Sequence, residues 1–224
     1  MTVDLLPSIH VPNFLTHSEV DNLALWIQEC SQKNSHIGRI KGDRFEGKLI
    51  ANYHQWKYYD SNIWSSKIRD LLEPKFQQLF PEYQTIFHSH ILESIIPYQL
   101  HSDYYHNDAA VQISKYTILI PLHDYDSNTV VFNEYLEDTN EFEQLKRHRD
   151  PYTELKIDPK FCANHLSHLH PKDLKYLSLK ETFKWNKGDF FAMDRKYIHC
   201  SDNFNKKGID KKLGIVIWTG IPKT

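Results

Sequence analysis

Five short apolar runs after residue 80 constrain the fold of this chain more than any other feature. Turn-forming residues bound them, and several are apolar on both faces, which is typical of strands in the core of a sandwich or barrel. They predict a β-rich core over about 85–220. The runs are "TIFHSHILESII" (85–96), "YTILIPL" (116–122), "NTVVFN" (128–133), "DFFAMD" (189–194) and "LGIVIWTG" (213–220).

Two amphipathic stretches precede these runs and predict helices. In "NFLTHSEVDNLALWI", Thr16 and Glu19 have the spacing of a capping box at a helix start. The second stretch covers about 61–80, and Pro74 should kink or split it. Because helices come first and strands later, the predicted fold class is mainly β with flanking helices (α+β), with the N-terminal helices packed outside a β core.

The length and composition favour one domain. A chain of 224 residues can fold around a single core, and no break in composition suggests a second domain. We expect a helical part over about 1–80 and the β core over about 85–220. A polar interval over about 134–184 is too long for a plain loop, so it predicts either an insertion or a lid over a site.

Composition and charge exclude several classes of function. The net charge is −2 with scattered basic residues, which argues against a nucleic-acid partner. No apolar run approaches the roughly 20 residues of a membrane span. The first residues lack a basic region followed by an apolar stretch, so we expect a cytoplasmic protein. The three cysteines suggest no disulfide framework, and the spacing in "NHLSHLH" (164–170) matches no closed zinc site.

Two His-x-Asp patterns lie close together in "YQLHSDYYHND" (98–108). Alternate residues of a strand project from the same face, so each pattern places an imidazole beside a carboxylate. His101 with Asp103, or His106 with Asp108, could supply two of the three ligands of a two-histidine, one-carboxylate iron site. A second histidine must then come from elsewhere in the chain.

His199 and Lys212 are the best partners for such a pair. His199 ends "WNKGDFFAMDRKYIH", where it follows a Gly-Asp turn and a short strand. Lys212 opens the most apolar strand of the chain, and Gly214, Val216 and Trp218 share its face. A lysine at the start of a strand, followed by a glycine on the same face, suits a cation that reaches inward toward an anionic ligand.

These blocks resemble the iron(II)- and 2-oxoglutarate-dependent oxygenases, especially the prolyl-hydroxylase-like and phytanoyl-CoA-hydroxylase-like branches. The shared blocks, in order, are "HSD" (101–103), "YTILIPL", "GDFFAMDRKYIH" (188–199) and "KLGIVIW" (212–218). They are separated and cover about half of the chain. The strand that leads into His101 favours the pair His101/Asp103, because such pairs end a strand in that family.

The resemblance implies a single oxygenase domain over 1–224 with a double-stranded β-helix (jelly-roll, cupin-like) core. It implies that His101, Asp103 and His199 bind Fe(II), that Lys212 pairs with the distal carboxylate of the cosubstrate 2-oxoglutarate, and that Thr117 adds a hydroxyl to that site. It also implies O2-dependent hydroxylation, since halogenating relatives lack the aspartate. The substrate implied is an unidentified small molecule or protein side chain, and either Lys211 or Lys212 could take the anchoring role.

Two other functions fit the same residues. The chain could be a β-sandwich that binds a glycan or a protein partner through aromatic residues, without turnover. It could also be a cupin-like metal enzyme that uses the same three ligands without 2-oxoglutarate. Replacement of Lys212 distinguishes the cupin-like enzyme from the 2-oxoglutarate-dependent oxygenase, because only the oxygenase requires that cation.

Overall fold

The computed structural model describes residues 4–33, 39–45, 48–57, 64–84, 88–104, 115–137, 142–219 and 221–222. The predicted pair His106/Asp108 lies outside these residues. In chain order, the helices and strands are β1 (Ile9–Val11), α1 (His17–Lys33), β2 (Arg39–Phe45), β3 (Lys48–Lys57), α2 (Trp64–Leu79), β4 (Tyr83–Gln84), β5 (His88–Ser94), β6 (Tyr116–Pro121), β7 (Asn128–Tyr135), α4 (Phe142–His148), α5 (Pro159–His165), α6 (Pro171–Leu174), β8 (Leu179–Lys184), β9 (Phe190–Asp194), β10 (Tyr197–Ser201), the 3-10 helix η1 (Phe204–Lys207), β11 (Lys212–Thr219) and β12 (Ile221–Pro222).

Two antiparallel sheets form the centre of the protein. The large sheet has the order β1-β9-β6-β11-β5-β3-β2, and the small sheet has the order β10-β7-β8. The chain after β5 extends the small sheet along the free edge of β10, because Ser201 N donates to Tyr98 O at 3.2 Å and Asp103 N donates to Arg195 O at 3.0 Å. The chain from β5 to β11 therefore passes repeatedly from one sheet to the other.

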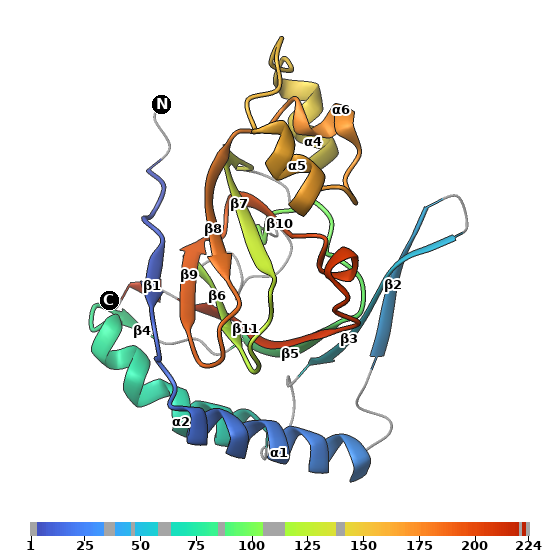
Figure 1. Ribbon diagram of the computed structural model, residues 1–224. Helices are drawn as coiled ribbons and strands as arrows, with labels where there is room; N and C mark the ends of the chain where they lie inside the picture. Colours follow the sequence, from blue (N-terminus) through green and yellow to red (C-terminus); the bar gives the residue numbers. More distant parts are fainter. Residues whose placement is uncertain are drawn as a thin grey trace.

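Three apolar clusters divide the protein into layers. The first lies between helices α1 and α2 and the outer face of the large sheet, and it includes Ile118 and Ile215. The second lies between the two sheets and includes Leu119 and Val216. The third covers the outer face of the small sheet with helices α4, α5 and α6. Figure 1 shows the two sets of helices on opposite sides of the sheets.

The two predicted helices are present, with one difference. The capping box is confirmed, since Thr16 N donates to Glu19 Oε2 at 2.8 Å and Glu19 N donates to Thr16 Oγ1 at 3.2 Å. Helix α2 runs through Pro74 as one element, so the predicted split does not occur. Its buried face, with Ile68 and Leu72 fully inaccessible to solvent, packs on the large sheet. The free energy gained by this burial exceeds the free energy lost with the one backbone hydrogen bond that proline removes.

The boundaries within the chain differ from the prediction in two places. The part before residue 80 is not all helical, because β1, β2 and β3 join the large sheet. Strands β2 and β3 are rich in polar and charged residues, so their sequences lack the apolar alternation that indicates a strand. The predicted insertion 134–184 is shorter, because its last residues form β8 and pair with β7.

The described part of the insertion is not a lid over the face that carries His199. Along β10, Ile198 and Cys200 belong to the outer cluster with α4, α5 and α6, whereas Tyr197 belongs to the cluster between the sheets. Because side chains alternate along a strand, His199 shares the inner face with Tyr197. The insertion helices therefore cover the opposite face, where their leucines bury the outer side of the small sheet.

No helix among the described residues is long and apolar enough to cross a membrane.

Candidate metal centre and buried lysine

The backbone brings two distant histidines together. His101 N donates to His199 O at 3.1 Å, and His199 N donates to His101 O at 2.9 Å, so the two residues form an isolated antiparallel bridge. Directly opposed residues of antiparallel strands project their side chains to the same face. The two imidazole rings consequently lie with their centroids 4.2 Å apart. His199 was predicted just beyond a strand, but it lies inside β10.

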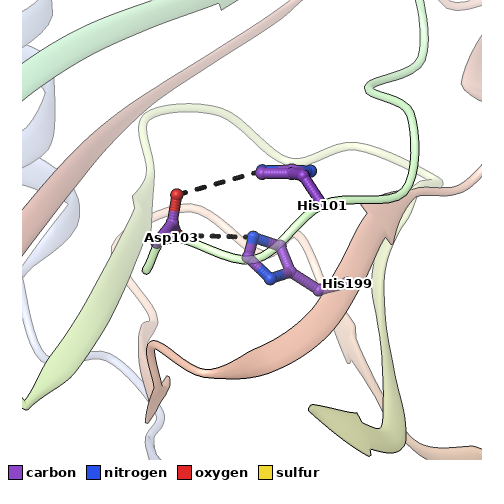
Figure 2. Close-up of side chains that lie close together, drawn as sticks. All are labelled: His101, Asp103 and His199. Atoms are coloured by element: carbon purple, nitrogen blue, oxygen red, sulfur yellow. Dashed lines mark ion pairs between the residues drawn. The ribbon is translucent and has the colours of Figure 1, made fainter. Parts of the chain in front are cut away.

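Asp103 completes a compact group of three candidate ligands (Figure 2). Its Oδ1 lies 3.9 Å from His101 Nε2, and its Oδ2 lies 3.4 Å from His199 Nε2. One ligand atom from each residue lies within 4.8 Å of the others, and in the described parts of the chain no other three His, Cys, Asp or Glu side chains meet in this way. The structure thus brings together the three residues that the sequence predicted as metal ligands.

The hydrogen bonds of the two imidazole rings determine which ring nitrogen carries the proton and which is the acceptor. His101 Nδ1 lies 2.8 Å from Gln99 O, and His199 Nδ1 lies 3.0 Å from Tyr197 O. A carbonyl only accepts, so each Nδ1 carries the proton, and each Nε2 of the neutral ring presents a lone pair. Both Nε2 atoms face a carboxylate, which also only accepts. Three acceptors that converge without a shared proton fit a divalent cation such as iron.

The electrostatics of the site favour the unprotonated forms that a metal requires. Burial and the neighbouring His199 lower the pKa of His101 to about 4. Burial alone would raise the pKa of Asp103, but the electrostatic effect of the neighbouring imidazoles and the hydrogen bond from Thr117 outweigh it and lower this pKa. Metal binding at neutral pH therefore displaces few protons from these two side chains.

Lys212 lies on the inner face of the large sheet and is fully buried. Its Nζ has no hydrogen-bond partner among the described residues and lies 4.0 Å from the centre of the Trp185 ring. Burial lowers its pKa to about 7, although Asp202 attracts the charge. A buried ammonium without a hydrogen-bonded counter-ion is costly, which is the state expected of an anion site without its ligand.

The neighbouring residues resolve two expectations about this lysine. Lys211 pairs with Glu93 at 3.1 Å and keeps 61% of its side-chain exposure, so it points away from the interior. Lys212 is therefore the lysine that faces inward. Gly214 leaves room for the Trp185 ring, because a Cβ at this position would lie 2.9 Å from Trp185 Cζ3. The predicted lysine-glycine pattern thus has a packing reason that the sequence alone did not give.

Thr117 forms a hydrogen bond with a candidate metal ligand, and its contact with the cosubstrate stays a prediction. Its Oγ1 donates to Asp103 Oδ2 at 2.8 Å, and both side chains are buried. The hydroxyl was predicted to serve the cosubstrate, but its single proton is directed to the candidate metal ligand. Fourteen residues separate Thr117 from Asp103, and no local pattern in the sequence signals this contact.

Two other histidine and cysteine interpretations are settled among the described residues. The histidines of "NHLSHLH" form no metal-binding group. His165 Nδ1 instead lies 3.5 Å from the buried Asp202, which also accepts from Lys207 Nζ at 2.9 Å. Cys200 is buried in the outer cluster, and burial raises the pKa of its thiol, so it is a packing residue rather than a nucleophile.

Comparisons of the sequence with protein-family models and with curated proteins found no match. Solved structures do match. The epimerase SnoN, in complex with Fe3+, alpha ketoglutarate and nogalamycin RO, superposes with a TM-score of 0.56 at 17% identity, over 96% of this chain and 78% of that chain. A prolyl-4-hydroxylase from Pseudomonas putida gives 0.51 at 13% identity, over 96% and 93% of the two chains. HygX from Streptomyces hygroscopicus, with nickel and 2-oxoglutarate bound, gives 0.53 at 13% identity, over 96% and 82%.

The names of SnoN and of the prolyl-4-hydroxylase describe different reactions, yet both proteins, like HygX, align along nearly all of this chain. The agreement therefore concerns the architecture rather than a particular substrate. The two antiparallel sheets with their flanking helices have the fold of the iron- and 2-oxoglutarate-dependent oxygenases.

Proposed function

We propose that the protein is an Fe(II)- and 2-oxoglutarate-dependent dioxygenase that couples oxidative decarboxylation of 2-oxoglutarate to hydroxylation of a substrate. One observation carries the proposal. Three acceptor atoms of His101, Asp103 and His199 converge in the interior between the sheets, and Lys212 presents a buried ammonium without a hydrogen bond on the inner face of the facing sheet.

The strand order supports a double-stranded β-helix as the core. From β5 to β11 the chain visits the large sheet at β5, β6, β9 and β11, and the small sheet at 98–103, β7, β8 and β10. These strands would form two facing four-stranded sheets, with the orders β9-β6-β11-β5 and β8-β7-β10-(98–103). This winding is that of a jelly roll, in which ligands bind between the two sheets.

His101, Asp103 and His199 would hold the iron. Two neutral imidazoles and one carboxylate compensate only part of a divalent charge and occupy one face of the ion, which leaves positions for further ligands. Bound Fe(II) would supply the redox chemistry with 2-oxoglutarate and O2. The backbone carbonyls of Gln99 and Tyr197 keep the two rings oriented through their Nδ1 atoms.

Lys212 would bind the distal carboxylate of 2-oxoglutarate. A carboxylate near Nζ would supply the counter-charge that the described residues do not provide through a hydrogen bond, and it would raise the pKa of the lysine again. The rings of Trp185 and Phe204, 4.0 and 4.9 Å from Nζ, exclude water on their side and strengthen such an ion pair.

A cupin-like metal enzyme that does not use 2-oxoglutarate is the second candidate. It shares the three candidate ligands, but it gives no reason for a buried lysine whose Nζ has no hydrogen-bond partner among the described residues. A binding module without turnover explains neither the lysine nor the three converging acceptors. The solved structures that hold 2-oxoglutarate on this fold also favour the dioxygenase.

Anaerobic titration with Fe(II) and 2-oxoglutarate tests the proposal. We expect a weak visible charge-transfer band in the wild-type protein, no band in Asp103→Ala or His199→Ala, and an unchanged band in His148→Ala, which alters an exposed histidine at the end of α4. A cupin-like enzyme would bind the metal without developing the band. A band of equal intensity in Asp103→Ala would contradict the assignment of the ligands.

A further inference from the structure

We propose that Thr117 is a positioning residue that holds the Asp103 carboxylate so that only one of its oxygens binds the metal. The inference rests on the proposed metal centre but concerns a residue outside it. The only hydroxyl that the described residues place on Asp103 is that of Thr117, whose Oγ1 lies 2.8 Å from Oδ2.

The hydroxyl is presented from a rigid position. Thr117 is 1% exposed, and it lies in β6, where its backbone is paired with Trp218 of β11 and Met193 of β9. A β-branched side chain in a paired strand has few rotamers. The large sheet therefore fixes the position of the hydroxyl that donates to Oδ2. Asp103, the acceptor, belongs to the segment that extends the small sheet.

The two carboxylate oxygens thus have different surroundings. Oδ2 accepts the proton of Thr117 and lies 3.4 Å from His199 Nε2, whereas Oδ1 lies 3.9 Å from His101 Nε2. A lone pair that accepts a hydrogen bond is less available to a metal, and a fixed hydroxyl stops the carboxylate from rotating. The asymmetry favours binding through a single oxygen.

Binding through one oxygen matters for the chemistry of the site. An octahedral ion with two imidazoles and one carboxylate oxygen keeps enough positions for a bidentate keto acid together with O2. If both carboxylate oxygens bound, one of those positions would be lost. Thr117 would thereby preserve the open position by acting through Asp103.

Binding of Co(II), measured by calorimetry and by visible absorption, tests the inference together with the affinity of the Co(II) protein for 2-oxoglutarate. Thr117→Val keeps the shape but removes the donor, and Thr117→Ser keeps the donor. In Thr117→Val we expect a changed Co(II) spectrum and about 10- to 100-fold weaker binding of Co(II) or 2-oxoglutarate. Thr117→Ser should restore both values to within a few-fold of the wild type.

The outcomes distinguish this inference from the proposed function. If the wild type binds Co(II) and 2-oxoglutarate and Thr117→Val binds them equally with the same spectrum, the positioning role is wrong and the dioxygenase proposal stands. If Thr117→Ser fails in the same way as Thr117→Val, packing rather than the hydroxyl matters, and the role is also wrong. If the wild type itself binds no metal, the proposed function fails and this inference fails with it.

Discussion

Replacement of Lys212 by methionine should make the ligand-free protein more stable while it weakens the binding of 2-oxoglutarate. Methionine is unbranched and apolar, so it can occupy the same space beside Trp185 without a charge. Burial lowers the pKa of Lys212 from 10.5 in the absence of the fold to about 7. The folded protein therefore carries a free-energy cost that the variant does not have.

The size of this cost follows from the pKa. One pKa unit corresponds to about 1.4 kcal/mol, so a fall from 10.5 to about 7 destabilises the folded state by up to about 5 kcal/mol. The cation–π contact with Trp185 offsets about 1–2 kcal/mol, which leaves about 3 kcal/mol. Because the folded state binds the proton less tightly than the unfolded state, the cost is fully present below pH 7. It shrinks as the pH rises toward 10.5.

Denaturant unfolding of the metal-free protein at pH 6 and pH 9 measures this effect. We expect Lys212→Met to raise the free energy of unfolding by about 3 kcal/mol at pH 6 and by less at pH 9. Lys211→Met is the matched control, since this exposed lysine pairs with Glu93 at the surface and should change stability by less than about 1 kcal/mol. A Lys212→Met protein that is less stable than the wild type at pH 6 would refute the reasoning.

The same variant should bind 2-oxoglutarate roughly 30- to 150-fold more weakly in the Mn(II)-loaded protein, because a charge-assisted contact contributes about 2–3 kcal/mol. In the wild type, the affinity should fall by up to tenfold per pH unit above about pH 7, since the ligand-free lysine must first take up a proton. Calorimetry should find no such slope in Lys212→Met. An equal slope in both proteins would assign the titration to another group.

Three further changes test other parts of the structure. Gly214→Ala should destabilise the protein by about 1–3 kcal/mol in urea unfolding, because the new Cβ would lie 2.9 Å from Trp185 Cζ3; no loss would mean that the ring moves freely. Thr16→Ala should lower the free energy of thermal unfolding by about 0.5–2 kcal/mol through loss of the capping box, and an unchanged melting curve would contradict this. Glu134→Ala should cost about 1–3 kcal/mol and increase proteolysis within 136–178, because Ser178 and the Tyr152 hydroxyl lose their buried acceptor; equal cleavage would show that the insertion is held elsewhere.

Sequence reasoning succeeded where a local pattern determines the outcome. Alternation along 212–218 placed Lys212 and Val216 on one face, and the structure places that face between the sheets. The capping box at Thr16 is likewise a local pattern. The three candidate ligands were predicted from spacing together with a resemblance, and the backbone bridge between His101 and His199 explains why residues so far apart in the chain meet.

The contacts that were missed depend on packing between distant segments. Strands β2 and β3 join the large sheet through backbone pairing with β5, which polar side chains do not reveal. The outward position of the insertion depends on which face of β10 is apolar, and Ile198 and Cys200 on that face share one cluster with Leu145 of α4 and Leu174 of α6. The partner of Thr117 depends on the separation of the two sheets, which no single strand encodes.

The division of the site between the two sheets has a consequence for stability. His101, Asp103 and His199 belong to the small sheet and its extension, whereas Lys212 and Thr117 belong to the large sheet. The hydrogen bond from Thr117 to Asp103 is one polar link between these halves. A molecule held at one end by the metal and at the other by Lys212 would be a second link, and it would give Nζ the hydrogen-bonded anion that the described residues do not provide. Cosubstrate binding should therefore offset the free-energy cost of burying the Lys212 ammonium in the ligand-free protein. The folded protein and its ligand then stabilise each other through the same buried charge.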